Sequence, residues 1–359
     1  MLLVSYLRTW PLGSTEEEMA QDRHWRAGEI RGELLDTVNL AFGLLSGNRI
    51  YIPHLAGESG GRHLFTEVAA LQGRHPHLKV NLSVGGWGAE GFSAMALTPE
   101  NRAAFTADAL NWLEGHDLDG IDIDWEYPVG REEGENYILL LADLRQGLNR
   151  LMERLSRPLT LSTAVPAASW FPRAIDLDRV QQQVDYLKLM AYDFYGGWSP
   201  TTGHTANLYR NPQDPADWSV DQAVQLYLAA GVRPDKLLLG VPFYARAWRG
   251  VAPENGGLYQ PYTSSAYEHG LSYTELQRFL ADPSYKRFWD DTAKAAYLYN
   301  GQELISYEDP QSLAHKAAYV REKGLGGIMI WEYGHDLSGQ LLEALHAALK
   351  GNVSNPENT

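Results

Sequence analysis

The sequence contains no cysteine, which excludes disulfides, thiol catalysis and cysteine-ligated metal sites. Positive charge is also scarce, because 30 Lys and Arg stand against 45 Asp and Glu, for a net charge of −15. A surface of this sign repels phosphate backbones and anionic lipids. Nucleic acid and membrane surfaces are therefore not expected partners, whereas a neutral substrate meets no such repulsion. No apolar run approaches the roughly 18 residues of a membrane span.

The start of the chain shows no signal peptide, since an apolar run follows directly after Met1. We expect a cytoplasmic protein if Met1 is the native start, and a secreted one if a leader was removed. The length of 359 residues and the 44% of hydrophobic residues suit one large α/β domain with an insertion, and we expect a monomer. The 11 Trp and 20 Tyr mildly favour a carbohydrate site, although many must be core residues.

Short apolar runs recur along the chain and mostly alternate with helix-like stretches. Strands separated by helices form parallel βαβ units, and eight such units predict a closed (β/α)8 barrel of the TIM type. An open doubly wound sheet is the alternative, but the first run leads into Arg8–Pro11, without a glycine-rich phosphate turn. The eight runs are Leu2–Tyr6, Leu35–Phe42, Leu78–Val84, Gly120–Glu126, Leu159–Val165, Val184–Tyr192, Lys236–Phe243 and Gly326–Trp331.

One interval, between the seventh and eighth runs, is too long for an ordinary βα loop. Its turn and aromatic residues predict a small α+β insertion over 249–308, between strand 7 and helix 7, with a helix at Thr274–Ala281. The barrel then comprises 1–248 and 309–350, with a helix at Gln311–Lys323, and 351–359 form a tail. Thr98 before Pro99 predicts a helix N-cap.

The chemistry-bearing stretch is Asp119–Pro128. Side chains alternate along a strand, so Asp122, Asp124 and Glu126 share one face, opposite two isoleucines and a tryptophan. The outer face of a barrel strand packs on helices, so the three acids are expected to point inward. Pro128 is expected to end the strand and to leave Glu126 at its C-terminal end, where barrel active sites lie.

Carboxylates stacked in a barrel interior cannot all ionise freely, so at least one pKa should rise. A raised carboxylic pKa suits a general acid near neutral pH, and Glu126 is the outermost of the three. A solvated acidic face and a calcium loop fit the alternation poorly. A divalent metal site stays an alternative of lower weight, because the acids stack in depth and no histidine lies nearby in sequence. We expect no metal and no cofactor.

The string Asp119-x-x-Asp122-x-Asp124-x-Glu126 resembles the signature of family 18 glycoside hydrolases, the chitinases and their relatives. Further blocks resemble the family's motifs in the same order, and the insertion matches the position of its chitinase insertion domain. These blocks are Ser83–Trp87, Met190–Asp193, Gly240–Arg246 and Gly327–Trp331, with Ile305–Pro310 at the exit of the insertion.

The resemblance implies retaining hydrolysis in which the N-acetyl oxygen of the substrate attacks, so that no enzyme carboxylate is the nucleophile. Glu126 would protonate the leaving oxygen and later activate water. Asp124 would orient the acetamido N–H, and the deeper Asp122 would support Asp124. Tyr192 would hydrogen-bond the acetamido oxygen, while Asp193 would help to hold that group.

Other residues are expected around the sugar. Trp331 would form the floor of the subsite that binds the distorted sugar ring. Trp87 and Trp198 are candidates for stacking on further sugar rings, with ordinary loop packing as the alternative. Tyr244 and Arg246, taken as the end of the seventh strand, are expected to reach substrate hydroxyls.

Several residues are expected to support the site. Ser83 and Tyr6 are expected to hydrogen-bond the acids, although satisfied core polar groups would fit equally well. Phe42 and Met190 are expected to bind the substrate by packing around the distorted sugar, and Gly85, Gly86 and Asp119 are expected to give structural support.

The expected substrate is chitin or a chito-oligosaccharide. A lectin-like sugar-binding protein on the same scaffold is one alternative, disfavoured because Glu126, Asp124 and Tyr192 are all present. A hydrolase of peptidoglycan or of the N-glycan core is another. The insertion and the many aromatic residues favour chitin-like chains.

Overall fold

The computed structural model describes residues 1–359 except 14–18, 20, 22, 54–59 and 352–359. The predicted tail therefore lies outside the described residues, apart from Gly351. None of the described helices is long and apolar enough to cross a membrane.

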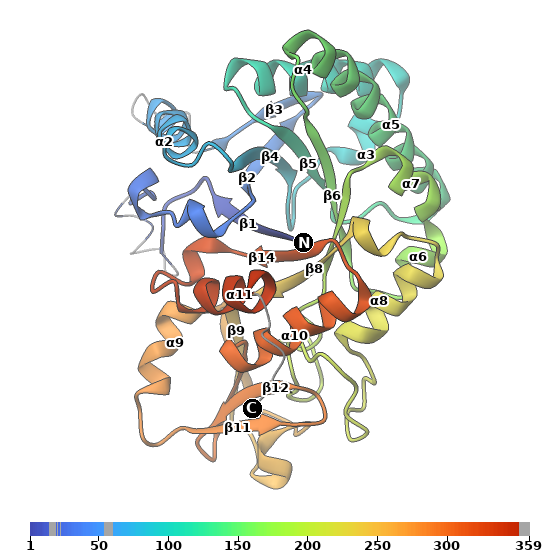
Figure 1. Cartoon of the computed structure of the whole chain (residues 1–359). Helices are drawn as coiled ribbons and strands as arrows, with labels where there is room; N and C mark the ends of the chain where they lie inside the picture. Colours follow the sequence, from blue (N-terminus) through green and yellow to red (C-terminus); the bar gives the residue numbers. More distant parts are fainter. Residues whose placement is uncertain (14–18, 20, 22, 54–59, 352–359) are drawn as a thin grey trace, which may run out of the picture.

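Eight parallel strands close into a barrel, as predicted, because β1 pairs with both β2 and β14. Helices surround the strands (Figure 1). A short antiparallel strand, β3 (Arg49–Tyr51), extends the end of β2. The barrel strands are β1 (Leu2–Arg8), β2 (Thr37–Ser46), β4 (Lys79–Gly85), β5 (Gly120–Asp124), β6 (Thr160–Pro166), β7 (Tyr186–Met190), β8 (Leu237–Pro242) and β14 (Gly327–Trp331).

The helices begin and end largely where the sequence signals place them. Thr98 caps α4 by accepting a hydrogen bond from the Asn101 backbone N–H, as predicted. The helices of the barrel are α2 (Gly60–Arg74), α3 (Phe92–Ala96), α4 (Pro99–Gly115), α5 (Gly130–Leu155), α6 (Phe171–Ala174), α7 (Leu177–Gln183), α8 (Val220–Ala229), α10 (Pro310–Lys323) and α11 (Gln340–Lys350).

The insertion forms a five-stranded antiparallel sheet in the order β10-β9-β13-β12-β11, with α9 (Tyr273–Leu280) beside it. Figure 1 shows this sheet at one side of the barrel. Its strands are β9 (Tyr244–Arg249), β10 (Ser264–Ser272), β11 (Lys286–Asp290), β12 (Ala295–Tyr299) and β13 (Glu303–Tyr307). The sheet thus begins at Tyr244, five residues before the start that the sequence suggested for the insertion.

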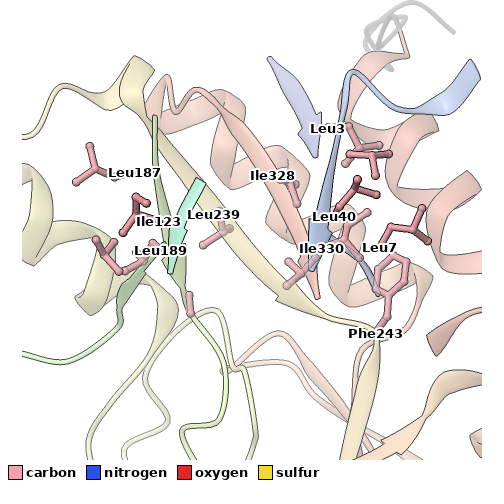
Figure 2. Close-up of a cluster of buried hydrophobic side chains, with 14 of the residues drawn as sticks. Leu3, Leu7, Leu40, Ile123, Leu187, Leu189, Leu239, Phe243, Ile328 and Ile330 are labelled. Carbon is pink, nitrogen blue, oxygen red and sulfur yellow. The ribbon is translucent and has the colours of Figure 1, made fainter. Parts of the chain in front are cut away.

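The main core lies between the outer faces of the barrel strands and the helices. Figure 2 shows Ile123, Leu187, Leu189 and Leu239 in this apolar cluster. The residues between them along each strand face the barrel interior, where a second, smaller cluster includes Tyr6, Met190 and Trp331. The predicted alternation along the acidic strand is therefore confirmed, since Ile121 and Ile123 belong to the outer cluster.

Candidate active site

Asp122 and Asp124 are buried in the barrel, at 0% and 3% exposure, and Glu126 is partly exposed beyond them. The prediction that the strand continues to Glu126 was wrong, because β5 ends at Asp124. The ladder with β4 stops at the pair Gly85–Asp124, after which the Gly86 N–H donates to the Asp124 carbonyl at 2.9 Å. Glu126 therefore lies in the loop that follows the strand. We name the three acids the acid column.

Asp122 receives hydrogen bonds from the two residues expected to support the acids. The Tyr6 hydroxyl donates to Asp122 Oδ2 at 2.7 Å, and the Ser83 hydroxyl donates to the same oxygen at 2.8 Å. In the described part of the chain, by contrast, the buried Asp124 Oδ1 has no hydrogen-bond partner. An unpaired buried oxygen is costly unless the group is protonated or meets a ligand.

Burial raises the pKa of Glu126 to about 7, with the Asp193 charge acting in the same direction. The pKa of Asp124 lies well above its usual range, chiefly through burial and then through the charges of Glu126 and Asp122. Two neighbouring carboxyl groups with raised pKa values hold a proton near neutral pH. The outer one, Glu126, can present that proton to a bound molecule.

Tyr192 and Asp193 follow β7 and are partly exposed. Burial raises the pKa of Tyr192 far above its ordinary value, so its hydroxyl remains a neutral donor. Gly240 on the neighbouring β8 leaves room for the Tyr192 ring, because an added Cβ would lie only 3.0 Å from Tyr192 Cε1. The tyrosine is thus packed into one position.

The assignment of Tyr244 and Arg246 to the end of a barrel strand was wrong. β8 ends at Pro242, level with Trp331, the last residue of its partner β14. The chain then pairs with β10 and β13 as β9. Arg246 from this strand donates two hydrogen bonds to the Asp193 carboxylate and forms an ion pair with it.

An aromatic group surrounds the barrel mouth. The Trp331 and Phe42 rings are stacked with centroids 5.5 Å apart, and the Tyr6 ring lies 5.4 Å from Trp331 at a tilt. Met190 packs against the same cluster. A partly exposed indole supported from behind is suited to an apolar sugar face.

The two tryptophans expected as platforms are both open to solvent, Trp87 at 84% exposure and Trp198 at 63%. The Trp198 ring also lies 5.1 Å from the Arg246 guanidinium carbon, a cation–π arrangement. Because tryptophan is highly buried on average, two indoles this open to solvent are candidate contact residues.

Two predicted supporting glycines sit where no side chain fits. Gly85 has φ +123°, and a Cβ there would lie 2.0 Å from the Asp124 carbonyl oxygen. A Cβ on Gly86 would lie 2.4 Å from the Phe42 ring. Asp119 lies at the opposite, N-terminal end of β5, where its carboxylate accepts from the Val80 N–H at 2.9 Å. Asp119 therefore contributes to the frame and not to the barrel mouth.

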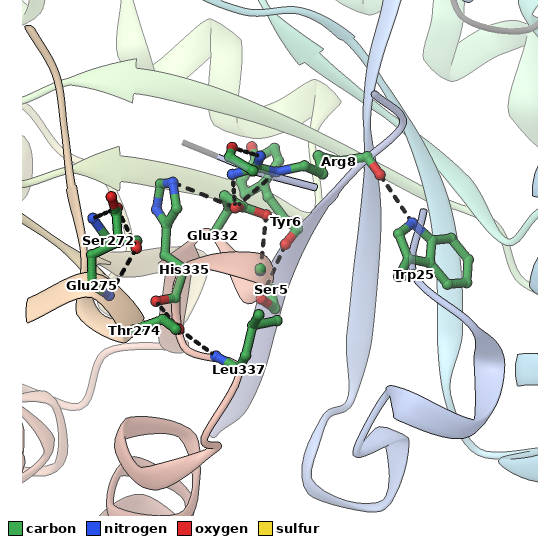
Figure 3. Close-up of polar contacts among 12 residues, drawn as sticks. Ser5, Tyr6, Arg8, Trp25, Ser272, Thr274, Glu275, Glu332, His335 and Leu337 are labelled. Atoms are coloured by element: carbon green, nitrogen blue, oxygen red, sulfur yellow. Dashed lines mark hydrogen bonds and ion pairs between the residues drawn. The ribbon is translucent and has the colours of Figure 1, made fainter. Parts of the chain in front are cut away.

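The sequence interpretation missed a polar group of Arg8, Glu332 and His335, shown in Figure 3. Arg8 donates to Glu332 Oε1 from Nε at 3.1 Å and from Nη2 at 2.5 Å, and His335 Nε2 lies 3.5 Å from the same oxygen. Alternation from Tyr6 to Arg8 could have placed the arginine inside the barrel. The same alternation from Tyr192 and Met190 points to a second missed residue, Lys188, which forms an ion pair with Asp122 at 3.0 Å.

No group of three or more acidic, histidine or cysteine side chains in the described ranges is arranged to hold a metal ion. Asp122, the innermost of the acids, instead contacts hydroxyl and cationic side chains. The arrangement suits proton transfer to a bound sugar.

Residues 4–336 match the family described as glycosyl hydrolases family 18. The chain belongs to this family. As a family 18 glycoside hydrolase, it carries the acid column and the antiparallel insertion sheet on one chain. This agrees with the resemblance found in its sequence motifs.

Relatives of this hydrolase include chitinase A1 of Niallia circulans, 36% identical over 304 residues, which are 78% of this chain and 44% of that protein. Chitinase 1 of Aphanocladium album is 34% identical, over 83% of this chain and 73% of that protein. The chain thus spans less than half the length of the first relative.

Solved structures agree with the fold. A family 18 N-acetylglucosaminidase of Paenibacillus barengoltzii has a TM-score of 0.84 and 35% identity, covering 97% of this chain and 99% of that chain. A mutant of the class V chitinase of Nicotiana tobaccum in complex with NAG4 has a TM-score of 0.86 and 25% identity, covering 97% and 98%.

Proposed function

We propose that this hydrolase cleaves β-1,4 linkages between N-acetylglucosamine units in chitin or chito-oligosaccharides, with retention at the anomeric carbon. The observation that carries the proposal is the acid column, in which burial raises the pKa of Glu126 to about 7 at the barrel mouth. Glu126 protonates the glycosidic oxygen and, as a carboxylate, then takes a proton from the incoming water.

The nucleophile is the acetamido oxygen of the substrate, which closes onto the anomeric carbon as the leaving sugar departs. The side chains nearest to Glu126 support this choice. Both oxygens of Asp193 are held by Arg246, and burial favours the protonated form of Asp124. Neither is a free carboxylate that could attack the sugar.

Asp124 and Tyr192 recognise the acetamido group. Asp124 Oδ1, which has no hydrogen-bond partner among the described residues, is available to accept from the acetamido N–H. The Tyr192 hydroxyl, neutral because burial raises its pKa, donates to the acetamido oxygen. Trp331 lies beneath the ring, on Phe42 and Tyr6. Preorganised groups of this kind stabilise charge as it develops.

A second candidate is the release of single N-acetylglucosamine units from chito-oligosaccharides. The resemblance to the Paenibacillus barengoltzii N-acetylglucosaminidase over 97% of this chain favours it. Products from chitohexaose separate the two possibilities, since monosaccharide release alone indicates the second and mixed oligosaccharides indicate the first.

The deciding test is Glu126→Gln, assayed with chitohexaose. We expect turnover to fall by about a thousandfold or more, while binding of the oligosaccharide survives. Glu132→Gln is the matched control, because Glu132 is exposed in the first turn of α5. Normal turnover by the Glu126 variant would disprove the proposed role. Indifference to a thiazoline analogue of the cyclised intermediate would argue against participation of the acetamido group.

A further inference from the structure

A lysine lies inside the barrel beside the acid column. Its neighbours on β7, Leu187 and Leu189, belong to the outer apolar cluster (Figure 2), so Lys188 faces the interior. The side chain is 2% exposed. Removing an ammonium group from water is costly unless a countercharge compensates it.

The surroundings of Lys188 supply that countercharge from two strands. Its Nζ lies 3.0 Å from Asp122 Oδ1 and 5.1 Å from the centroid of the Tyr6 ring. The titratable groups that face it are Asp122 and Asp124 from β5 and Tyr6 from β1. Burial lowers the pKa of Lys188, and the two aspartates oppose that effect.

Asp122 is surrounded by donors on both of its oxygens. Tyr6 and Ser83 donate to Oδ2 at 2.7 and 2.8 Å, Ser162 donates to Oδ1 at 2.8 Å, and the Lys188 ammonium lies at 3.0 Å from Oδ1. Three hydroxyl hydrogen bonds and one ion pair thus surround a carboxylate that has about four acceptor positions. A protonated Asp122 would have to donate to one of the hydroxyl groups and would give up its charge pairing with the ammonium group, which cannot accept.

We propose that Lys188 is a positioning residue that keeps Asp122 an ionised, fully engaged carboxylate, so that the mobile proton of the acid column is confined to Asp124 and Glu126. The inference rests on the proposed function, in which Glu126 is the proton donor. Because three hydroxyl donors and an ammonium group already surround Asp122, a proton on Asp124 is directed outward, toward Glu126 and the substrate.

The electrostatics agree with this geometry. Burial alone would raise the pKa of Asp122, but the Lys188 charge and the hydrogen bonds from Tyr6 and Ser162 lower it below its ordinary value. Asp124 lies two residues further along β5, and its pKa is raised instead. The pKa values of two inward aspartates on one strand are thus shifted in opposite directions, and the lysine and the hydroxyl donors lie beside the inner one.

The test is a charge-balance experiment on the pH profile of kcat/KM, with 4-nitrophenyl chitobioside as substrate. Lys188→Met leaves an uncompensated anion and should move the basic limb of the profile to higher pH, by about half a unit or more. Asp122→Asn leaves an uncompensated cation and should move that limb to lower pH. The double variant should return it to the wild-type position.

Lys316→Met is the matched control. Lys316 is the other fully buried lysine in the described part of the chain, and it forms an ion pair with Glu308. Its loss should lower the temperature of unfolding without moving the basic limb. Lys188→Met itself could fail to fold. The double variant and Asp122→Asn differ only at residue 188, so the difference between their basic limbs measures the same effect of the lysine charge.

The proposal is overturned if Lys188→Met leaves the basic limb in place, or if the two single variants move it in the same direction. An inactive wild-type enzyme would instead count against the proposed function. In that case, NMR titration of the Asp122 and Asp124 carboxyl carbons in wild type and Lys188→Met still decides the role of the lysine. The proposal is overturned if the titration of Asp122 is the same in wild type and in Lys188→Met.

Discussion

Arg246 holds both carboxylate oxygens of Asp193, from Nε to Oδ1 at 2.8 Å and from Nη2 to Oδ2 at 2.9 Å. The arginine comes from the insertion sheet and the aspartate from the barrel, so this pair joins the two parts at the active site. Asp193 has φ +59°, a conformation that non-glycine residues seldom adopt. The insertion therefore takes part in positioning the residue next to Tyr192.

Loss of this pair should reduce catalysis. We expect Arg246→Ala to lower kcat/KM by roughly tenfold to a hundredfold, because Asp193 would lose its bidentate partner and its orientation. Arg249→Ala is the control, since Arg249 lies on the same strand, its side chain is 54% exposed and its ion-pair partner is Glu303. Equal effects of the two variants would show that the Asp193 contact is not the cause.

Activity should fall as the pH rises through about 7. Glu126 must be protonated to act as an acid, and its pKa is raised to about 7 by burial and the Asp193 charge. The proton is present below that pH and is lost above it, so the basic limb of kcat/KM reports the residue in the free enzyme. A profile still flat above pH 8 would contradict the pKa.

Glu126 should also make the stability depend on pH. Its pKa is higher in the folded than in the unfolded chain, so the folded state disfavours the ionised form. The free energy of unfolding therefore falls as the pH rises from about 4.5 to 7. Glu126→Gln removes that cost. We expect the midpoint temperature of thermal unfolding to rise by roughly 2–4 °C at pH 7 and to change little at pH 4. A rise of equal size at both values would point to another cause.

Trp87 should matter for long substrates. Its ring is 84% exposed, so truncation costs little packing but removes an apolar platform. We expect Trp87→Ala to raise KM for chitohexaose several-fold while hydrolysis of a chitobioside is nearly unchanged. Leu280→Ala, at an exposed apolar position at the end of α9, serves as control. Identical losses on both substrates would exclude a remote platform.

Asp119 should affect stability and not chemistry. Its buried carboxylate accepts from the Val80 N–H at 2.9 Å and from Arg157 Nη1 at 2.9 Å. Asp119→Ala leaves these donors unpaired and should cost about 1–3 kcal/mol of unfolding free energy, with kcat retained at temperatures where the variant is folded. Asp117→Ala, at an exposed partner of the same arginine, should cost less.

The barrel, the insertion and the inward direction of the acids could be predicted, because alternation and the spacing of apolar runs are local properties of the sequence. The bidentate partner of Asp193 could not be predicted, since Arg246 lies on a strand of the other sheet and the pairing of β9 with β10 and β13 places it there. The inward direction of Lys188 could have been predicted, because it lies four residues before Tyr192 and therefore on the same face of the strand. The ionic contact itself is tertiary.

Closure of the barrel has a consequence for synthesis of the protein. β1 begins at Leu2 and its partner β14 at Gly327, so the first barrel strand to be synthesised pairs with the last one. Until then the sheet keeps two open edges, which are templates for pairing with other chains. Chains truncated before β14 should therefore aggregate, and chaperone demand should end only when the C-terminal segment has been made.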